Sequence, residues 1–65
     1  MFSYNNLWKL LIDRNMTKTQ LRQQIGIGTA TLAKLSANEN VSMVVLDKIC
    51  KELHCKIEDV VTHIE

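Results

Sequence analysis

The stretch TKTQLRQQIGIGTATLAKL, residues 17–35, decides the fold, because it holds two short helical patterns separated by a glycine turn. Thr17, followed three residues later by Gln20, is typical of a capping box, in which each side chain bonds the backbone amide of the other residue. Gly26 suits the left-handed conformation that ends many helices. The stretch therefore predicts a helix that begins after Thr17 and ends at Gly26.

A second short helix is expected from Thr29 to about Ser36. Gly28 stands at its N-cap position, where glycine is acceptable but offers no side-chain bond. The residues expected to be buried in the two helices and the turn are Leu21, Ile25, Ile27, Leu32 and Leu35. The outward residues of the second helix are Thr29, Ala30, Thr31, Ala33 and Lys34. Because most of these side chains are small, this side of the helix is expected to approach another molecule closely.

Three more helices are predicted on either side of this pair, which gives an all-α fold, a compact five-helix bundle. The first runs from about Tyr4 to Asp13 and stops at Asn15, the fourth is capped by Ser42 and runs to about Leu53, and a short fifth covers residues 57–62 or beyond. Asn38 or Asn40 can take a positive φ in the turn before Ser42. The expected apolar faces contain Tyr4, Leu7, Trp8, Leu11, Ile12 and Met16, then Leu46, Ile49, Cys50 and Leu53, and finally Val60, Val61 and Ile64.

The length of 65 residues predicts a single domain, 1–65, with one small core. Basic residues gather in its first half, because residues 1–34 hold five Lys or Arg against one acid, net +4, whereas residues 35–65 hold three against six, net −3. A molecule polarised in this way can present a positive face to an anion although its total charge is only +1. No signal peptide or long apolar run is visible, which predicts a cytoplasmic protein.

The two cysteines, Cys50 and Cys55, fit neither a CxxC pair nor a disulfide framework. One interpretation is that they are reduced, partly buried thiols. The other is a zinc site built from Cys50, His54, Cys55 and His63, which needs all four ligands to converge. The spacing favours plain thiols, so no metal or other cofactor is expected.

The sequence resembles the Cro/cI-type (Xre-like) helix-turn-helix family of bacterial and phage transcriptional regulators. The resemblance covers TKTQLRQQIGIGTATLAKLSANENVSMVVLDKICKELHCKIEDVV and the preceding LWKLLIDRNM, which is nearly the whole chain. Its more specific parts are VSxxxLxKICKxL in the fourth expected helix and the hydrophobic and turn positions Leu21, Ile25, Gly26, Ile27, Leu32 and Leu35. The resemblance implies a lambda-repressor-like fold with the helix-turn-helix in the second and third helices.

The resemblance also implies sequence-specific binding to double-stranded DNA as a transcriptional regulator, with the third helix in the major groove. The base-reading residues it implies are Thr29, Ala30, Thr31, Ala33 and Lys34. Small side chains suit a groove about 12 Å wide, because they let the helix backbone lie close to the base edges. The phosphate-contacting residues it implies are Thr17, Lys18, Thr19, Asn38 and Asn40. Its further implication is a repressor that binds an inverted repeat as a homodimer.

Three positions depart from the family pattern. Arg22 stands where alanine is usual, at the close crossing of the second and third helices. Residues 36–38, SAN, replace a common glutamate and glycine, although asparagine tolerates a left-handed position. Lys56 replaces a serine-like cap, which predicts a frayed last helix.

Alternative interpretations exist for several of these features. Thr29, Thr31 and Lys34 are also compatible with a solvated helix surface, and Trp8 on its apolar stripe is expected to be a core or interface residue. The alternative function keeps the fold but assigns it to protein association, as in an antitoxin-like or adaptor domain. An enzyme is not expected, because the sequence shows neither a nucleophile, base and orienter set nor a glycine-rich phosphate loop.

Overall fold

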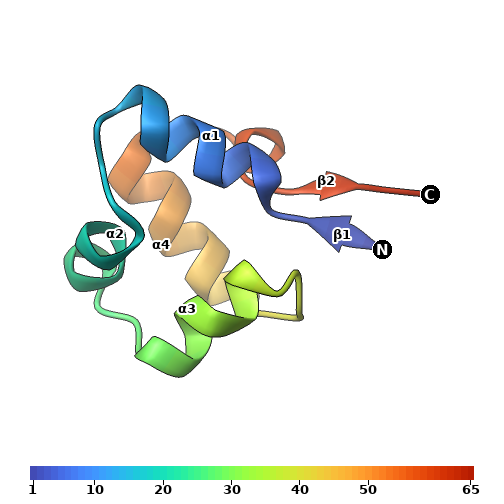
Figure 1. Cartoon of the computed structure of the whole chain (residues 1–65), viewed down its shortest axis with the longest axis horizontal. Helices are drawn as coiled ribbons and strands as arrows, with labels where there is room; N and C mark the ends of the chain where they lie inside the picture. The colour runs from blue at the N-terminus through green and yellow to red at the C-terminus, as the bar shows by residue number, and fades with distance from the viewer.

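The computed structural model describes residues 1–65 as four α-helices, one 3-10 turn and a small two-stranded sheet (Figure 1). In chain order the elements are β1 (Phe2–Ser3), α1 (Asn5–Asp13), α2 (Lys18–Ile25), α3 (Thr29–Ser36), α4 (Met43–Leu53), η1 (Ile57–Asp59) and β2 (Thr62–His63). The first four expected helices are therefore confirmed with nearly the same bounds. Each helix is too short or too polar to cross a membrane.

The prediction of a fifth helix is wrong. After the single turn of η1, the chain becomes extended, and β2 pairs antiparallel with β1, with Phe2 opposite His63 and Ser3 opposite Thr62. Val60, Val61 and Thr62 are β-branched, which favours extended backbone over a helix. The molecule is thus mostly helical rather than all-α, and its two termini lie side by side at one end (Figure 1).

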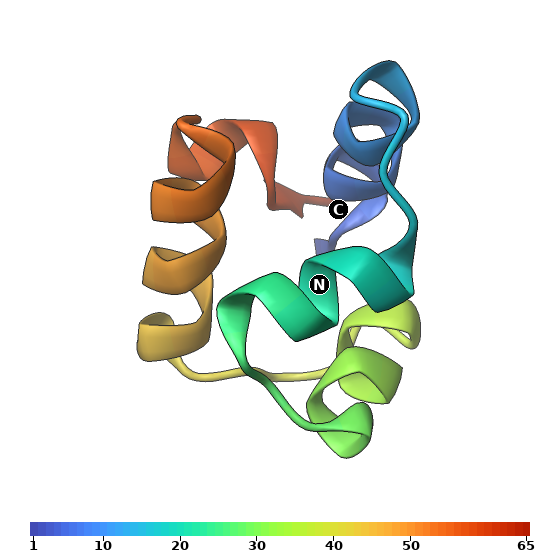
Figure 2. The ribbon, with the colours of Figure 1, turned by 90° about the vertical axis from the view of Figure 1, so that its left-hand side faces the viewer.

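One apolar core joins the four helices. It consists of Tyr4, Leu7, Leu11, Leu21, Ile25, Ile27, Leu35, Leu46, Ile49, Leu53 and Val60. Trp8, Met16, Cys50 and Val61, also expected on apolar faces, are partly buried against this core. Three other expectations are wrong, because Leu32 is only half-buried, Ile12 is 73% exposed and Ile64 is 42% exposed. Ile12 lies about 100° around the helix from the buried Leu11, and Ile64 follows β2 at the free end of the sheet. In Figure 2, α1 and α4 stand on opposite sides of the molecule, and α2 and α3 cross beneath them.

Local hydrogen bonds fix the joint between α2 and α3. The Gln20 amide donates to Thr17 Oγ1 at 3.1 Å and the Thr17 amide donates to Gln20 Oε1 at 2.8 Å, which confirms the capping box. Gly26 has φ 69°, the left-handed conformation that its position predicts. The Arg22 carbonyl accepts from the amides of Gly26 and Ile27 at 3.0 and 3.2 Å. The turn therefore leaves α2 at a defined angle.

The other helix ends also follow the sequence. Asn15, Asn38 and His54 have φ of 55°, 57° and 51° after α1, α3 and α4, so each helix is stopped by a left-handed residue. The Val45 amide donates to Ser42 Oγ at 3.3 Å, which confirms the cap of α4. These ends place α3 at the surface between two fixed turns.

Candidate nucleic-acid interface

The outer side of α3 carries most of the residues to which base reading was assigned from sequence. The exposed members are Thr29, Ala30, Ala33 and Lys34. Thr31 is half-buried, because it lies one turn before the fully buried Leu35 and so on nearly the same side of the helix. The structure therefore brings two alanine methyl groups, one threonine and one lysine together on an accessible surface.

The first turn of α3 keeps its backbone donors open. Gly28 occupies the N-cap with extended backbone, and no side chain bonds the first amides of the helix. These amides carry the positive end of the helix dipole, which favours a negative group nearby. The exposed start of α3 can therefore approach an anion without first breaking an internal bond.

A buried brace holds α3 in place. Ile25 at the end of α2 and Ile27 in the turn belong to the same core as Leu35, and the two helices cross closely (Figure 2). Arg22, the departure at this crossing, is half-buried, with Nη1 3.5 Å from the Ile27 carbonyl oxygen. Its stem thus lies along the turn, where it leaves the crossing intact.

The start of α2 lies against the end of α3. Thr17, Lys18 and Thr19 are all exposed there. Lys18 Nζ lies 4.1 Å from the centroid of the Trp8 ring and donates a hydrogen bond to Ser36 Oγ at 3.3 Å. Two residues absent from the sequence-based site, Trp8 and Ser36, therefore adjoin it.

Asn38 and Asn40 follow α3 in different surroundings. The Tyr4 amide donates to Asn38 Oδ1 at 3.0 Å, and the Tyr4 hydroxyl donates to the Glu39 carbonyl at 2.9 Å, so the end of α3 is tied to the start of α1. The NH₂ group of the Asn38 side chain, which is its only donor group, is not used by this bond and can donate to an anion. Asn40 is exposed and lines an apolar groove beside α4.

The four candidate zinc ligands do not come together. No group of three or more His, Cys, Asp or Glu side chains is placed to hold a metal ion. Cys50 and Cys55 are free and half-buried. Burial, followed by the neighbouring Cys50, raises the pKa of the Cys55 thiol, so this thiol stays protonated at neutral pH.

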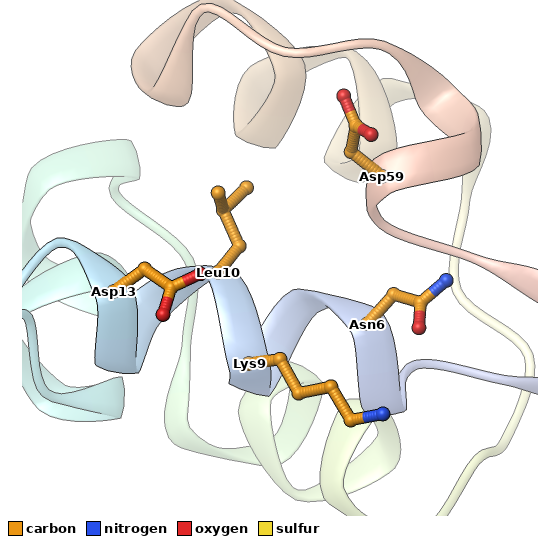
Figure 3. Close-up of a pocket in the computed structure, with 5 residues that line it drawn as sticks. All are labelled: Asn6, Lys9, Leu10, Asp13 and Asp59. Carbon is orange, nitrogen blue, oxygen red and sulfur yellow. The ribbon is translucent and has the colours of Figure 1, made fainter.

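A shallow hollow of about 180 Å³ lies between α1 and η1 (Figure 3). It is lined by Asn6, Lys9, Leu10, Asp13 and Asp59. Two carboxylates, Asp13 from α1 and Asp59 from η1, stand against the single lysine of this lining, and this balance does not favour a phosphate. It is therefore distinct in chemistry from the surface formed by α2 and α3.

Comparisons with known proteins agree with this geometry. The family described as the Cro/C1-type HTH DNA-binding domain matches residues 6–65, nearly the whole chain. Among solved structures, the crystal structure of the transcriptional regulator VanUg, form II, is similar, with 51% sequence identity and a TM-score of 0.95. That similarity covers 97% of this chain and 84% of the other. None of the curated proteins compared with the chain matches it.

Proposed function

The chain belongs to the family of Cro/C1-type helix-turn-helix DNA-binding domains, and on this premise we propose that it regulates transcription by binding a specific sequence of double-stranded DNA. In this proposal α3 enters the major groove. The observation that carries it is that one side of α3 is exposed and bears mainly small side chains, while Leu35 on its opposite side is buried in the core. The similarity to VanUg, a transcriptional regulator, supports the regulatory role.

Base reading is assigned to Thr29, Ala30, Thr31, Ala33 and Lys34. The methyl groups of Ala30 and Ala33 keep the helix thin enough for close approach and suit contact with thymine methyl groups. Lys34 donates to guanine or to a phosphate, and Thr29 offers a hydroxyl at the open end of the helix. Thr31 is expected to contribute least, because it is half-buried.

Phosphate contacts are assigned to Thr17, Lys18, Thr19, Asn38 and Asn40. The residues at the start of α2 combine the positive end of a helix with the charge of Lys18, which suits a phosphate. The two asparagines follow α3 and offer amide donors. The weaker of the two is expected to be Asn38, since it is half-buried whereas Asn40 is exposed.

Homodimeric binding to an inverted repeat, with repression of transcription, completes the proposal. Two copies of α3 must reach successive major grooves about 34 Å apart. The longest extent of the molecule is 31 Å, so two copies in direct contact suit this spacing. The candidate surfaces for such a contact are the exposed apolar residues of α1, such as Ile12, and the C-terminal segment near Val61 and Ile64. The other exposed apolar side chains are Met1, Phe2, Met43, Val44 and Ile57. A dimer seated on DNA represses by excluding other proteins from the same site.

An affinity selection from a random duplex library at low salt tests the proposal. We expect enrichment of an inverted repeat whose half-sites lie about one helical turn apart. Enrichment of a single half-site, together with a monomer in sedimentation at tens of micromolar, would exclude the homodimer but leave DNA binding intact. No enrichment above a scrambled control would contradict sequence-specific binding.

Protein association, as in an antitoxin-like or adaptor domain, is the second candidate function. The observation that favours it is the apolar groove of about 250 Å³ beside α4, which includes Phe2, Val41, Met43 and Ile57. Salt dependence separates the two functions, because phosphate neutralisation makes log affinity fall linearly with log salt, whereas an apolar contact responds little. A ligand bound with no salt slope would favour protein association.

A further inference from the structure

We infer that Trp8 is a positioning residue of the DNA interface, because its ring and the Ser36 hydroxyl hold the Lys18 ammonium ready for a backbone phosphate. The inference rests on the proposed function, since it requires the start of α2 to face DNA. It adds two residues, Trp8 and Ser36, that act through Lys18 and contact no base.

The three side chains come from three different helices. Trp8 belongs to α1, Lys18 is the first residue of α2, and Ser36 is the last residue of α3. The distance of 4.1 Å from Nζ to the ring centroid lies well within the range of a cation–π interaction, for which tryptophan is the best partner. The 3.3 Å bond to Ser36 Oγ fixes the ammonium from a second side. Its position is therefore set relative to the whole helix-turn-helix, including α3.

The stem of Lys18 also has a defined place. Trp8, Leu11, Ile12, Met16 and Lys18 line a hollow of about 130 Å³ on the surface of α1. Lysine commonly lays its methylene groups on apolar surface while its charge stays in water. An exposed lysine otherwise loses much rotamer freedom when a ligand fixes it. Because the ring and the hydroxyl order this side chain beforehand, a phosphate has less ordering left to impose.

The partners of Lys18 hold its charge without neutralising it. The structure contains one ion pair, between Lys51 and Asp47 on α4. Lys18 therefore has no carboxylate partner that competes with a phosphate. An indole ring and a hydroxyl are both uncharged. The ammonium has three donors, and one is used by Ser36. A donor and the full positive charge therefore remain for a phosphate.

A double-mutant cycle on DNA affinity tests the inference. The probe is a short duplex of arbitrary sequence at low salt, because phosphate contacts do not depend on the bases. Trp8→Leu removes the ring and keeps an apolar side chain, and Lys18→Ala removes the charge. We expect Trp8→Leu to raise Kd about 2- to 5-fold when Lys18 is present and to leave Kd unchanged in the Lys18→Ala protein. Equal weakening in both backgrounds would mean that Trp8 supports only the fold, which overturns the inference.

The salt slope separates failure of the inference from failure of the proposed function. Lys18→Ala should lower the slope of log affinity against log salt by about 0.9 per protein molecule. The matched control is Lys48→Ala, which removes an exposed lysine from α4 and should leave the slope unchanged. If Lys18→Ala also leaves it unchanged while the wild type binds, the inference is wrong and DNA binding stands. If the wild type fails to bind the duplex, the proposed function itself fails.

A measurement on the unmodified protein covers the case in which Trp8→Leu does not fold. Protons held over an aromatic ring are shifted upfield in the NMR spectrum by the ring current. We expect the ε-methylene protons of Lys18 to show such a shift relative to those of Lys48, and Ser36→Ala to reduce it. Equal shifts for the two lysines would show that Lys18 does not stay on the ring, and the inference would be abandoned.

Discussion

The helices α2 and α3 have the same length of eight residues but begin in opposite ways. At the start of α2, Thr17 and Gln20 close the capping box through two hydrogen bonds between side chain and backbone. At the start of α3, Gly28 offers no side chain, and the first amides have no side-chain partner. One helix thus satisfies its own terminus and the other leaves it open.

The inner sides of the two helices, in contrast, are alike. Leu21 in α2 and Leu35 in α3 both have 0% exposure, and both belong to the single core. The difference between the helices therefore lies at their surfaces. The comparison indicates that the shared core and the capping box of α2 stabilise the pair, while the uncapped start and the exposed side of α3 are accessible to another molecule.

The largest expected effect is on the free energy of unfolding, and it tests whether the buried sides of α2 and α3 contribute equally to the core. Leu21→Ala and Leu35→Ala should each lower the free energy of unfolding by about 2–5 kcal/mol, because each removes a fully buried side chain and leaves a cavity in the core. Urea denaturation of the two variants measures this. The control, Thr29→Ala on the exposed side of α3, should stay within about 0.5 kcal/mol of the wild type. If only one of the two variants lost much less free energy of unfolding than this, the helix that contains that leucine would not depend on the shared core, and the two inner sides would not be alike.

The next effect concerns the outer side of α3. Lys34→Ala should reduce discrimination at one base pair of the selected site by about 1–3 kcal/mol, while the unfolding transition stays in place. Competition binding against single-base variants of the site measures the change. Lys48→Ala, the matched control on α4, should leave the base preference unaltered. If Lys34→Ala weakens binding equally on every sequence, Lys34 contacts phosphate rather than a base.

Most of the helix-turn-helix could be predicted from sequence, because its signals are local. Gln20 lies three residues from Thr17, and Gly26 follows directly on the apolar pattern of α2. The cap of α4 at Ser42 is equally local. In each case the residue and its hydrogen-bond partner lie within one helical turn, so spacing alone identifies the contact.

The largest error arises where contacts join distant parts of the chain. The sequence predicts a helix for the last segment, yet β2 pairs with β1 from the other end of the sequence, and strands of two residues are too short to show alternation. Similarly, no spacing rule connects Trp8, Lys18 and Ser36, whose contact depends on how α1, α2 and α3 meet. The assignment of roles to α3 came from the resemblance, and those roles stay predictions.

A smaller effect addresses the closed start of α2. Thr17→Ala should lower the free energy of unfolding by about 1 kcal/mol, because the Gln20 amide loses its acceptor and the box is broken. Thermal unfolding followed by circular dichroism measures it, with the neighbouring exposed Thr19→Ala as control. If the free energy of unfolding falls no further than in Thr19→Ala, water satisfies the Gln20 amide as well as Thr17 does, and the capping box does not stabilise the protein.

The smallest effect on stability tests the open start of α3. A side chain fits at Gly28, since a Cβ atom there meets nothing within 4 Å and the backbone is extended, with φ −78°. Gly28→Ser and Gly28→Asp should therefore each cap α3 and raise the free energy of unfolding by a few tenths of a kcal/mol. Their effects on DNA affinity should differ, because the aspartate adds a negative charge at the start of the helix that is proposed to enter the major groove, and the DNA is itself negatively charged.

We expect Gly28→Asp to bind DNA more weakly than Gly28→Ser, with the gap between them narrowing as salt is raised. Thermal unfolding and binding titrations at two salt concentrations give both quantities for the same pair of proteins. If the two variants bind DNA equally well, the start of α3 does not lie close to DNA and its uncapped amides have no role in recognition. If aspartate stabilises the fold while it weakens binding, glycine is kept at this position at the expense of stability, which is what an open terminus reserved for DNA requires.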